Sequence, residues 1–355
     1  MDLTRRDFLK ASSAVGAALG LTASGVLDLQ EANAKEGGLP VIWLTGSSCT
    51  GCSVSVLNSI YYATIDNLLV NTLDMEYHTQ LSAAAGAMAV KAMEDRRKAG
   101  GYALVVEGAI PTADTGKGCY VWPGMTMLSA VKSYAANAAM VIACGTCASF
   151  GGVAAAAPNP TAAKSVQAVV GTTKPLINIP GCPVHPDWIV GTIASYLSTK
   201  TLPTLDSNRR PTAYYGATVH SACGWRTQYV GPGHHSKGKP CTICHSSNMG
   251  HIIAGVLGDS GCMYGLGCKG PLTYADCPNR RWNSGTASTP GMHWCVSAYA
   301  PCNGCTQPNF PDGMSPFYAM SGTATTNTGG TTSGGTTGGT TSGGTTSSDR
   351  ERDDD

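Results

Sequence analysis

The stretch PVIWLTGSSCTGCSVSVLNS (residues 40–59) sets the first expectation for the fold. Residues 40–46 form an apolar run of the length of a buried β-strand, and the residues after Cys52 can continue as a helix. Cys49 and Cys52 stand three apart at this junction. Two thiols at that spacing can form a redox disulfide, a zinc knuckle or half of an iron–sulfur site. The positions of the other cysteines, of the fifteen in the chain, are needed to choose among these.

Strand-like and helix-like stretches alternate from residue 38 to residue 200. Apolar runs at 102–108, 139–147 and 174–182 are typical of further buried strands. Helical stretches lie at 82–101, which ends in two glycines, at 127–138 and at 187–197. Strands separated by helices indicate a parallel sheet with helices on both faces. We therefore expect an α/β domain over residues 38–200, with a flavodoxin-like, doubly wound parallel sheet.

Four cysteines follow the carboxyl ends of these expected strands. In doubly wound sheets chemistry gathers beyond those ends, so cysteines that follow separate strands can converge. Four thiolates suit a cubane iron–sulfur cluster, and they also suit structural zinc. Zinc knuckles usually pair two local C-x-x-C turns, whereas here one such pair joins two distant single cysteines, which favours the cluster. The four residues are Cys49, Cys52, Cys147 and Cys182.

Glycine and cysteine replace the alternating pattern from residue 201 to residue 320. Besides the pair Cys241 and Cys244, seven cysteines and one histidine stand out, enough for two clusters of four ligands each. Disulfides with a surface histidine are the alternative, which an exported protein permits. The H-x-x-C spacing has no role in a disulfide framework. We therefore expect a loop-rich C-terminal domain that is held together by its metal clusters. The eight residues are His220, Cys223, Cys262, Cys268, Cys277, Cys295, Cys302 and Cys305.

The two ends of the chain do not have the pattern of a folded domain. Arg5 and Arg6 precede a weakly apolar stretch and the small residues 32–34, which is typical of a twin-arginine export signal over residues 1–34. Residues 321–355 are mostly Gly, Thr and Ser and predict a disordered tail. Outside the signal, no apolar run has the length of a membrane span. The net charge of +1, with 13% charged residues, provides no basic surface for nucleic acid.

Several stretches together resemble the small, electron-transferring subunit of an exported nickel–iron hydrogenase. They extend over residues 39–318, nearly the whole chain between the signal and the tail. The resemblance implies a partner large subunit, which holds the nickel–iron centre where hydrogen is split, and three iron–sulfur clusters in this chain. The stretches are SSCTGCSVSVLNS (47–59), VVEGAIPT (105–112), GTCASFGGV (145–153) with PNPT (158–161), IPGCP (179–183), GCMYGLGCKGP (261–271), DCPNR (276–280) and PCNGCTQPNFPDGMSPFY (301–318).

The resemblance also assigns the cluster ligands, residue by residue. The proximal 4Fe–4S cluster, which faces the large subunit, takes Cys49, Cys52, Cys147 and Cys182. The distal 4Fe–4S cluster, with one imidazole ligand, takes His220, Cys223, Cys262 and Cys268. The medial cluster takes Cys277, Cys302 and Cys305.

Cys295 decides the type of the medial cluster. Many members of the family have a proline at this place and a 3Fe–4S cluster. A fourth thiolate would hold a fourth iron, so we expect a medial 4Fe–4S cluster; if Cys295 is a bystander, the cluster is 3Fe–4S. Oxygen-tolerant members carry two extra cysteines at the proximal site, at places that Gly51 and Gly152 occupy here. The resemblance therefore implies an ordinary proximal cubane without that protection.

Three of the remaining residues form a second motif. Cys241, Cys244 and His245 read CTICH, the pattern of covalent c-type haem attachment. They lie in an apparent insertion between the two pairs of distal ligands, where a haem would serve as an electron exit. A loop disulfide or a fortuitous histidine is the alternative. Cys144 reads as a buried thiol within a strand, and Cys119 has no expected role.

The resemblance implies a function for the chain as a whole. Electrons from hydrogen oxidation in the large subunit would pass through the proximal, medial and distal clusters to a cytochrome-type acceptor in the periplasm, and the mature chain would not span the membrane. A stand-alone periplasmic multi-cluster carrier is the main alternative. A zinc and disulfide protein is another. The third is the related quinone-reductase subunit, which holds one cluster. The eight further ligands from His220 onward argue against this alternative.

Overall fold

The computed structural model describes residues 39–59, 64–69, 73–171, 174–199, 201–226, 257–258, 261–280, 282 and 293–318. The export signal expected at 1–34, the motif Cys241, Cys244 and His245, and the tail expected at 321–355 lie outside the described residues. No helix among the described residues has the length and apolar character that crossing a membrane requires.

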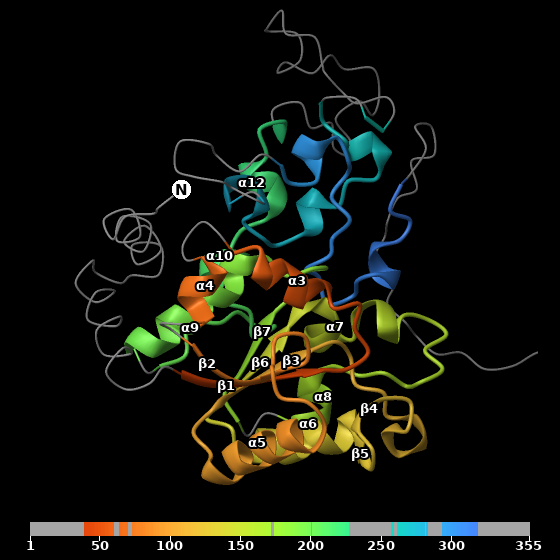
Figure 1. Ribbon diagram of the computed structural model, residues 1–355. Coiled ribbons are helices and arrows are strands. Elements are labelled where there is room, and N and C mark those ends of the chain that lie inside the picture. Colours follow the sequence, from red (N-terminus) through yellow and green to blue (C-terminus); the bar gives the residue numbers. More distant parts are fainter. Residues whose placement is uncertain are drawn as a thin grey trace, which may run out of the picture. The chain divides into compact units, whose positions relative to one another are not determined.

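A five-stranded parallel sheet forms the centre of the N-terminal region (Figure 1). The strand order is β2-β1-β3-β6-β7, and every neighbouring pair is parallel. This is the flavodoxin-type order, so the structure confirms the expected α/β class. The three central strands are apolar almost throughout because both faces of the sheet are covered. The strands are β1 (Leu39–Thr45), β2 (Leu73–His78), β3 (Ala103–Glu107), β6 (Met140–Cys144) and β7 (Leu176–Ile179).

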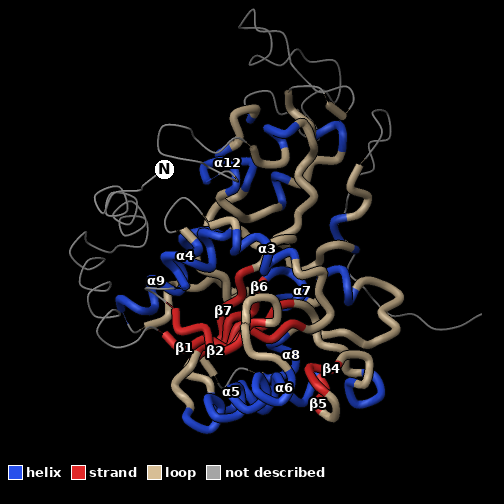
Figure 2. The backbone as a smooth tube through the Cα atoms, viewed as in Figure 1, coloured by secondary structure: helices blue, strands red, loops and turns tan. Residues whose placement is uncertain are grey.

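Helices cover both faces of this sheet (Figure 2). One apolar cluster packs α5 (Gly86–Ala99), α6 (Met127–Asn137) and α8 (Val166–Val170) against alternate strand residues. The other cluster packs α3 (Gly51–Leu57), α9 (Pro186–Thr199) and α10 (Thr212–Tyr215) against the opposite face. Smaller elements are α4 (Ile65–Asn67), the hairpin of β4 (Tyr120–Trp122) and β5 (Met125–Thr126), and the 3-10 helices η2 (Ala113–Gly116) and η3 (Gly152–Ala155).

Two features of the sheet differ from the expectation. The strand expected at 139–147 ends at Cys144, and Cys147 lies in the helix α7 (Gly145–Phe150), because Gly145 takes a φ of +83° and turns the chain. The edge strand β2 was not expected at all. Its residues, LDMEYH, are mostly half-buried and carry charges, so they lack the apolar run of a buried strand.

The C-terminal region is rich in loops, as expected. It packs onto the sheet face that carries α9 and α10, and shares one apolar cluster with it. Trp188 Nε1 of α9 donates to Asp276 Oδ1 at 2.7 Å, and Arg280 pairs with Asp187 at 3.4 Å. The division near residue 200 stays a prediction. The short helices are α12 (Cys277–Arg280), η4 (Val219–Ala222), η6 (Tyr264–Leu266), η7 (Gly270–Leu272), η8 (Val296–Ala298) and η9 (Asp312–Met314).

Candidate metal centres

The four cysteines expected at the proximal site lie together beyond the carboxyl edge of the sheet. Cys49 precedes α3, Cys52 lies in its first turn, Cys147 lies in α7, and Cys182 follows β7. Burial is the main effect that raises the pKa of the Cys182 thiol to about 11, and the charges of Cys147, Cys52 and Cys49 add to it. Thiols held this close to one another suit a site where a metal centre supplies the compensating positive charge.

Gly145 allows the turn after β6 to approach the first cysteine pair. A Cβ built at this position would collide with Cys52 Sγ, and the φ of +83° also disfavours any other residue. The adjacent Cys144 is fully buried and carries a free thiol, as expected. Burial, followed by its contact with Cys52, raises the pKa of Cys144 well above the ordinary value.

A buried carboxylate, Glu107, holds the turn that carries the first cysteine pair. It ends β3 and is 1% exposed. Trp43 Nε1 donates to it at 3.1 Å, Ser48 Oγ at 3.0 Å and the backbone N–H of Cys52 at 3.1 Å, and Ser53 Oγ also donates to it. Sequence reasoning quoted this residue only as part of a motif. Its signal was a single acidic residue at the end of an otherwise apolar strand.

The four cysteines of the expected medial set also converge. The Cys277 thiol lies partly buried at the start of α12, and loss of solvent around it raises its pKa well above the ordinary value. The charges of Cys305, Cys302 and Cys295 raise it further, so all four thiols interact. Cys295 therefore lies with the other three.

The four residues expected at the distal site line one pocket. Burial, and then the nearby charge of Arg226, lower the pKa of His220, which favours the neutral imidazole that binds metals. Burial raises the pKa of the Cys223 thiol, and the charges of Cys268 and Cys262 contribute to the rise. The lining includes His220, Cys223, Cys262 and Cys268, together with Val219, Trp225, Met263, Tyr264, Gly270, Pro271, Trp294 and Val296.

Direct contacts join the neighbouring sets. Burial raises the pKa of the Cys305 thiol of the medial set, and the charge and backbone N–H of Cys182, in the proximal set, also act on it, so the two residues lie side by side. The backbone N–H of Lys269, the residue after Cys268 of the distal set, donates to the carbonyl oxygen of Cys302 at 2.7 Å. The medial set is therefore in contact with both others.

The alternatives based on zinc and disulfides find no support among the described residues. Every cysteine of the described residues carries a free thiol. No three His, Cys, Asp or Glu side chains in the described ranges are arranged to hold a single metal ion. Ligands of a cluster bind different iron atoms, so they lie farther apart than ligands of one ion.

Comparison with known proteins identifies the family. Residues 239–318 match the model of the C-terminal region of the NiFe/NiFeSe hydrogenase small subunit, and residues 49–196 match that of the NADH ubiquinone oxidoreductase 20 kDa subunit. The chain is 38% identical over 341 residues to the periplasmic [NiFeSe] hydrogenase small subunit of Desulfomicrobium baculatum, a match that spans 90% of this chain and 99% of that relative. The chain belongs to the nickel–iron hydrogenase small-subunit family.

Other relatives and solved structures agree with this assignment of the small subunit. The present chain is 37% identical over 317 residues to the periplasmic [NiFe] hydrogenase small subunit of Solidesulfovibrio fructosivorans, and the match spans 89% of this chain and 93% of the relative. The structure of a reduced, active Ni-Fe-Se hydrogenase from Desulfomicrobium baculatum matches with a TM-score of 0.68 at 38% identity, over 79% of this chain and 98% of that one. The match over both regions argues against the one-cluster quinone-reductase subunit.

The same comparisons confirm the export signal of the small subunit. Residues 2–22 match the model of the twin-arginine translocation signal, and the relatives named above are periplasmic. The small subunit is therefore exported by the twin-arginine route to the periplasm.

Proposed function

We propose that this chain carries electrons through three iron–sulfur clusters between a nickel–iron active site in a partner large subunit and a cytochrome-type acceptor. The observation that carries the proposal is the contact of the medial cysteine set with both other sets. The clusters, when bound, supply one-electron carriers. The chain's own residues supply thiolate and imidazole ligands, and Cys182, Cys305 and Lys269 hold the neighbouring sets next to one another.

The ligand sets follow the assignment made from the sequence. The proximal set is Cys49, Cys52, Cys147 and Cys182. The medial set is Cys277, Cys295, Cys302 and Cys305. The distal set is His220, Cys223, Cys262 and Cys268. The interaction of the Cys277 thiol with the three other medial thiols supports a four-cysteine medial site and hence a medial 4Fe–4S cluster.

The large subunit would cover the proximal set. Cys49 is exposed, and so are the apolar side chains of Val54 in α3 and Val153 in η3, with 54% and 57% of their surface accessible. Exposed apolar residues beside a metal site are typical of an interface with another protein. The alternative, a stand-alone carrier, would leave this site in contact with water.

Metal analysis of the purified exported complex tests the proposal. Three cubanes predict about twelve iron and about twelve acid-labile sulfide per small subunit. One iron fewer would contradict the role of Cys295, and about four iron would contradict the medial and distal sites. Failure of a large subunit to co-purify with the tagged chain would favour the stand-alone carrier. The prediction that Cys241, Cys244 and His245 bind haem is tested on the same sample, by a pyridine haemochrome spectrum of the denatured chain.

A further inference from the structure

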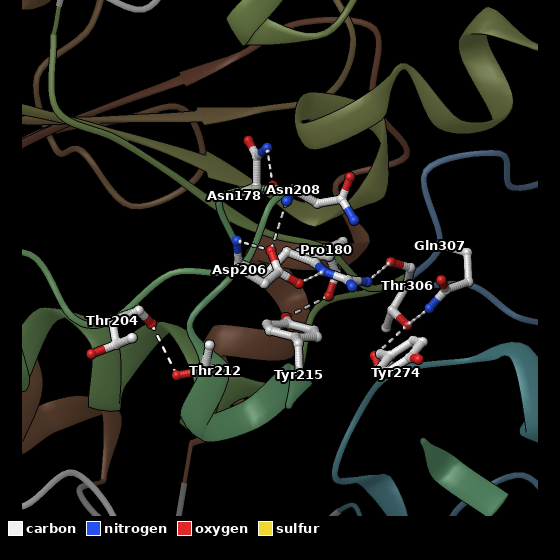
Figure 3. A network of polar contacts seen from close by, with 11 residues as sticks. Asn178, Pro180, Thr204, Asp206, Asn208, Thr212, Tyr215, Tyr274, Thr306 and Gln307 are labelled. Atoms are coloured by element: carbon white, nitrogen blue, oxygen red, sulfur yellow. Dashed lines mark hydrogen bonds and ion pairs between the residues drawn. The ribbon is translucent and has the colours of Figure 1, made fainter. Parts of the chain in front are cut away.

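Arg210 is a buried cation next to the medial cysteine set. Its side chain is 4% exposed, and it lies two residues before the start of α10. Arg210 Nη1 donates to the carbonyl oxygen of Thr306 at 3.1 Å, and Thr306 is the residue after Cys305. The guanidinium lies over the ring of Tyr215 at 5.4 Å from its centroid and over that of Tyr274 at 5.8 Å. Figure 3 shows this network, with Tyr215, Tyr274 and Thr306 drawn around it.

The counter-ion of Arg210 lies at a different edge of the guanidinium. Asp206 Oδ2 accepts from Arg210 Nε at 2.8 Å. The other oxygen, Oδ1, accepts from the backbone N–H groups of Asn208 and Arg210, both at 2.9 Å. The Asp206 side chain is 20% exposed, whereas that of Arg210 is 4% exposed. Water and two backbone donors therefore screen the negative charge of Asp206 more strongly than the positive charge of Arg210 is screened. The pair therefore presents its positive end to the loop of Cys305.

Tyr215 connects Arg210 to the rest of the metal site. The ring is almost fully buried, and its hydroxyl donates to the carbonyl oxygen of Pro180 at 2.7 Å, in the loop that leads to Cys182. Burial raises the pKa of Tyr215 well above its ordinary value, and the charges of Asp276, Arg210, Cys277 and Cys305 also act on it, so these groups lie near the ring. Arg210 lies over this buried ring, and two medial cysteines lie near it, in a place where charges are poorly screened.

We propose that Arg210 sets the reduction potential of the medial cluster, because its buried positive charge stabilises the additional electron of the reduced state. The inference rests on the medial cluster proposed above. This electrostatic role can be told apart from a purely structural one. If Arg210 only held the loops together, the effect of removing a charge on the medial potential would not depend on the sign of that charge. Burial and net charge near a cluster are among the factors that set its potential.

Two substitutions with opposite expected effects test the proposal. Arg210→Gln removes the cation and is expected to lower the medial potential. Asp206→Asn removes the anion and is expected to raise it. We expect the ratio of reduced to oxidised medial cluster at a fixed ambient potential to change about threefold to tenfold in each case, where tenfold corresponds to about 59 mV for a one-electron couple. Redox titration of the anaerobic heterodimer, followed by electron paramagnetic resonance, measures this ratio.

Two further variants are controls for structure. Tyr215→Phe removes the hydrogen bond to Pro180 without a change of charge and is expected to leave the ratio within about twofold of the wild type. Arg210→Lys keeps a positive charge but loses the planar group that meets Asp206 and Thr306, so its shift is expected to be smaller than that of Arg210→Gln. Equal shifts in the same direction for Arg210→Gln and Asp206→Asn, or no shift with a full iron content, would overturn the proposal. A wild-type complex without a third cluster signal would instead refute the function proposed above, and this inference with it.

Discussion

The hydroxyl of Thr146 donates a hydrogen bond to the carbonyl oxygen of Cys305, and it accepts one from the backbone N–H of Gly181 at 2.9 Å. Thr146 is 1% exposed and comes directly before Cys147. One buried hydroxyl therefore ties together two loops of the proximal set and one loop of the medial set.

Thr146→Val is expected to destabilise the clusters, because it leaves the N–H of Gly181 and the carbonyl of Cys305 buried without this partner. The expected cost is about 1–3 kcal/mol. The denaturant concentration that bleaches half of the cluster absorbance should fall. Thr146→Ser keeps the hydroxyl and should retain most of the stability. Thr79→Val, at an exposed threonine, is the matched control. A valine variant as stable as the serine variant would contradict this role.

Cys295→Ala is expected to convert the medial cluster to 3Fe–4S. The iron content should fall by about one atom per chain, and the oxidised protein should gain the resonance of a three-iron cluster. Cys119→Ala is the control, because Cys119 is partly buried and belongs to none of the three sets. An unchanged iron content and spectrum in the Cys295 variant would show that this thiol is a bystander.

Gly145→Ala is expected to prevent assembly of the proximal cluster, because a Cβ there collides with Cys52 Sγ. About eight iron atoms should remain per chain. Gly101→Ala is the control: its φ is also positive, at +70°, but a Cβ there meets nothing within 4 Å. It should therefore show the backbone strain alone, with a full iron content. Equal iron contents in the two variants would contradict the steric argument.

The stability of the protein should depend on pH through Asp187. Burial raises the pKa of Asp187 to about 6, although the charge of Arg280 opposes the rise. The folded protein holds this proton more tightly than the unfolded chain, so the free energy of unfolding falls as the pH rises from about 4 to about 6, by up to about 3 kcal/mol. Asp187→Asn should flatten this part of the profile. Melting temperatures of both proteins from about pH 4 to about pH 7 measure the difference; parallel profiles would contradict it.

Apolar runs of sequence were sufficient to predict most of the sheet, because the inner strands are buried on both faces and read as continuous apolar segments. The same logic failed for β2, whose edge position leaves charged residues such as Asp74 and Glu76 in the strand. The turn at Gly145 was also missed, since an apolar run followed by Gly-Thr-Cys does not mark where a strand ends.

The cysteine pattern and the family motifs were sufficient to predict the three ligand sets. The residues that support those sets could not be found in the same way. Thr146 and Cys305 are 159 positions apart, and Arg210 and Thr306 are 96 apart. No local spacing indicates such contacts, which depend on how the C-terminal region packs on the sheet.

The two glycines at the proximal site bear on how oxygen protection could be acquired. A side chain at Gly51 would first meet Cys49 Sγ, at 3.1 Å, a contact that a small rotation relieves. At Gly152 the φ is +52°, and a Cβ would lie 2.8 Å from Cys147 Sγ and 2.9 Å from the Cys147 backbone. Grafting the six-cysteine arrangement onto this scaffold therefore requires remodelling the turn between α7 and η3. Acquiring the extra cysteines would therefore require a change of the backbone conformation at Gly152, and a substitution to cysteine alone would not be enough.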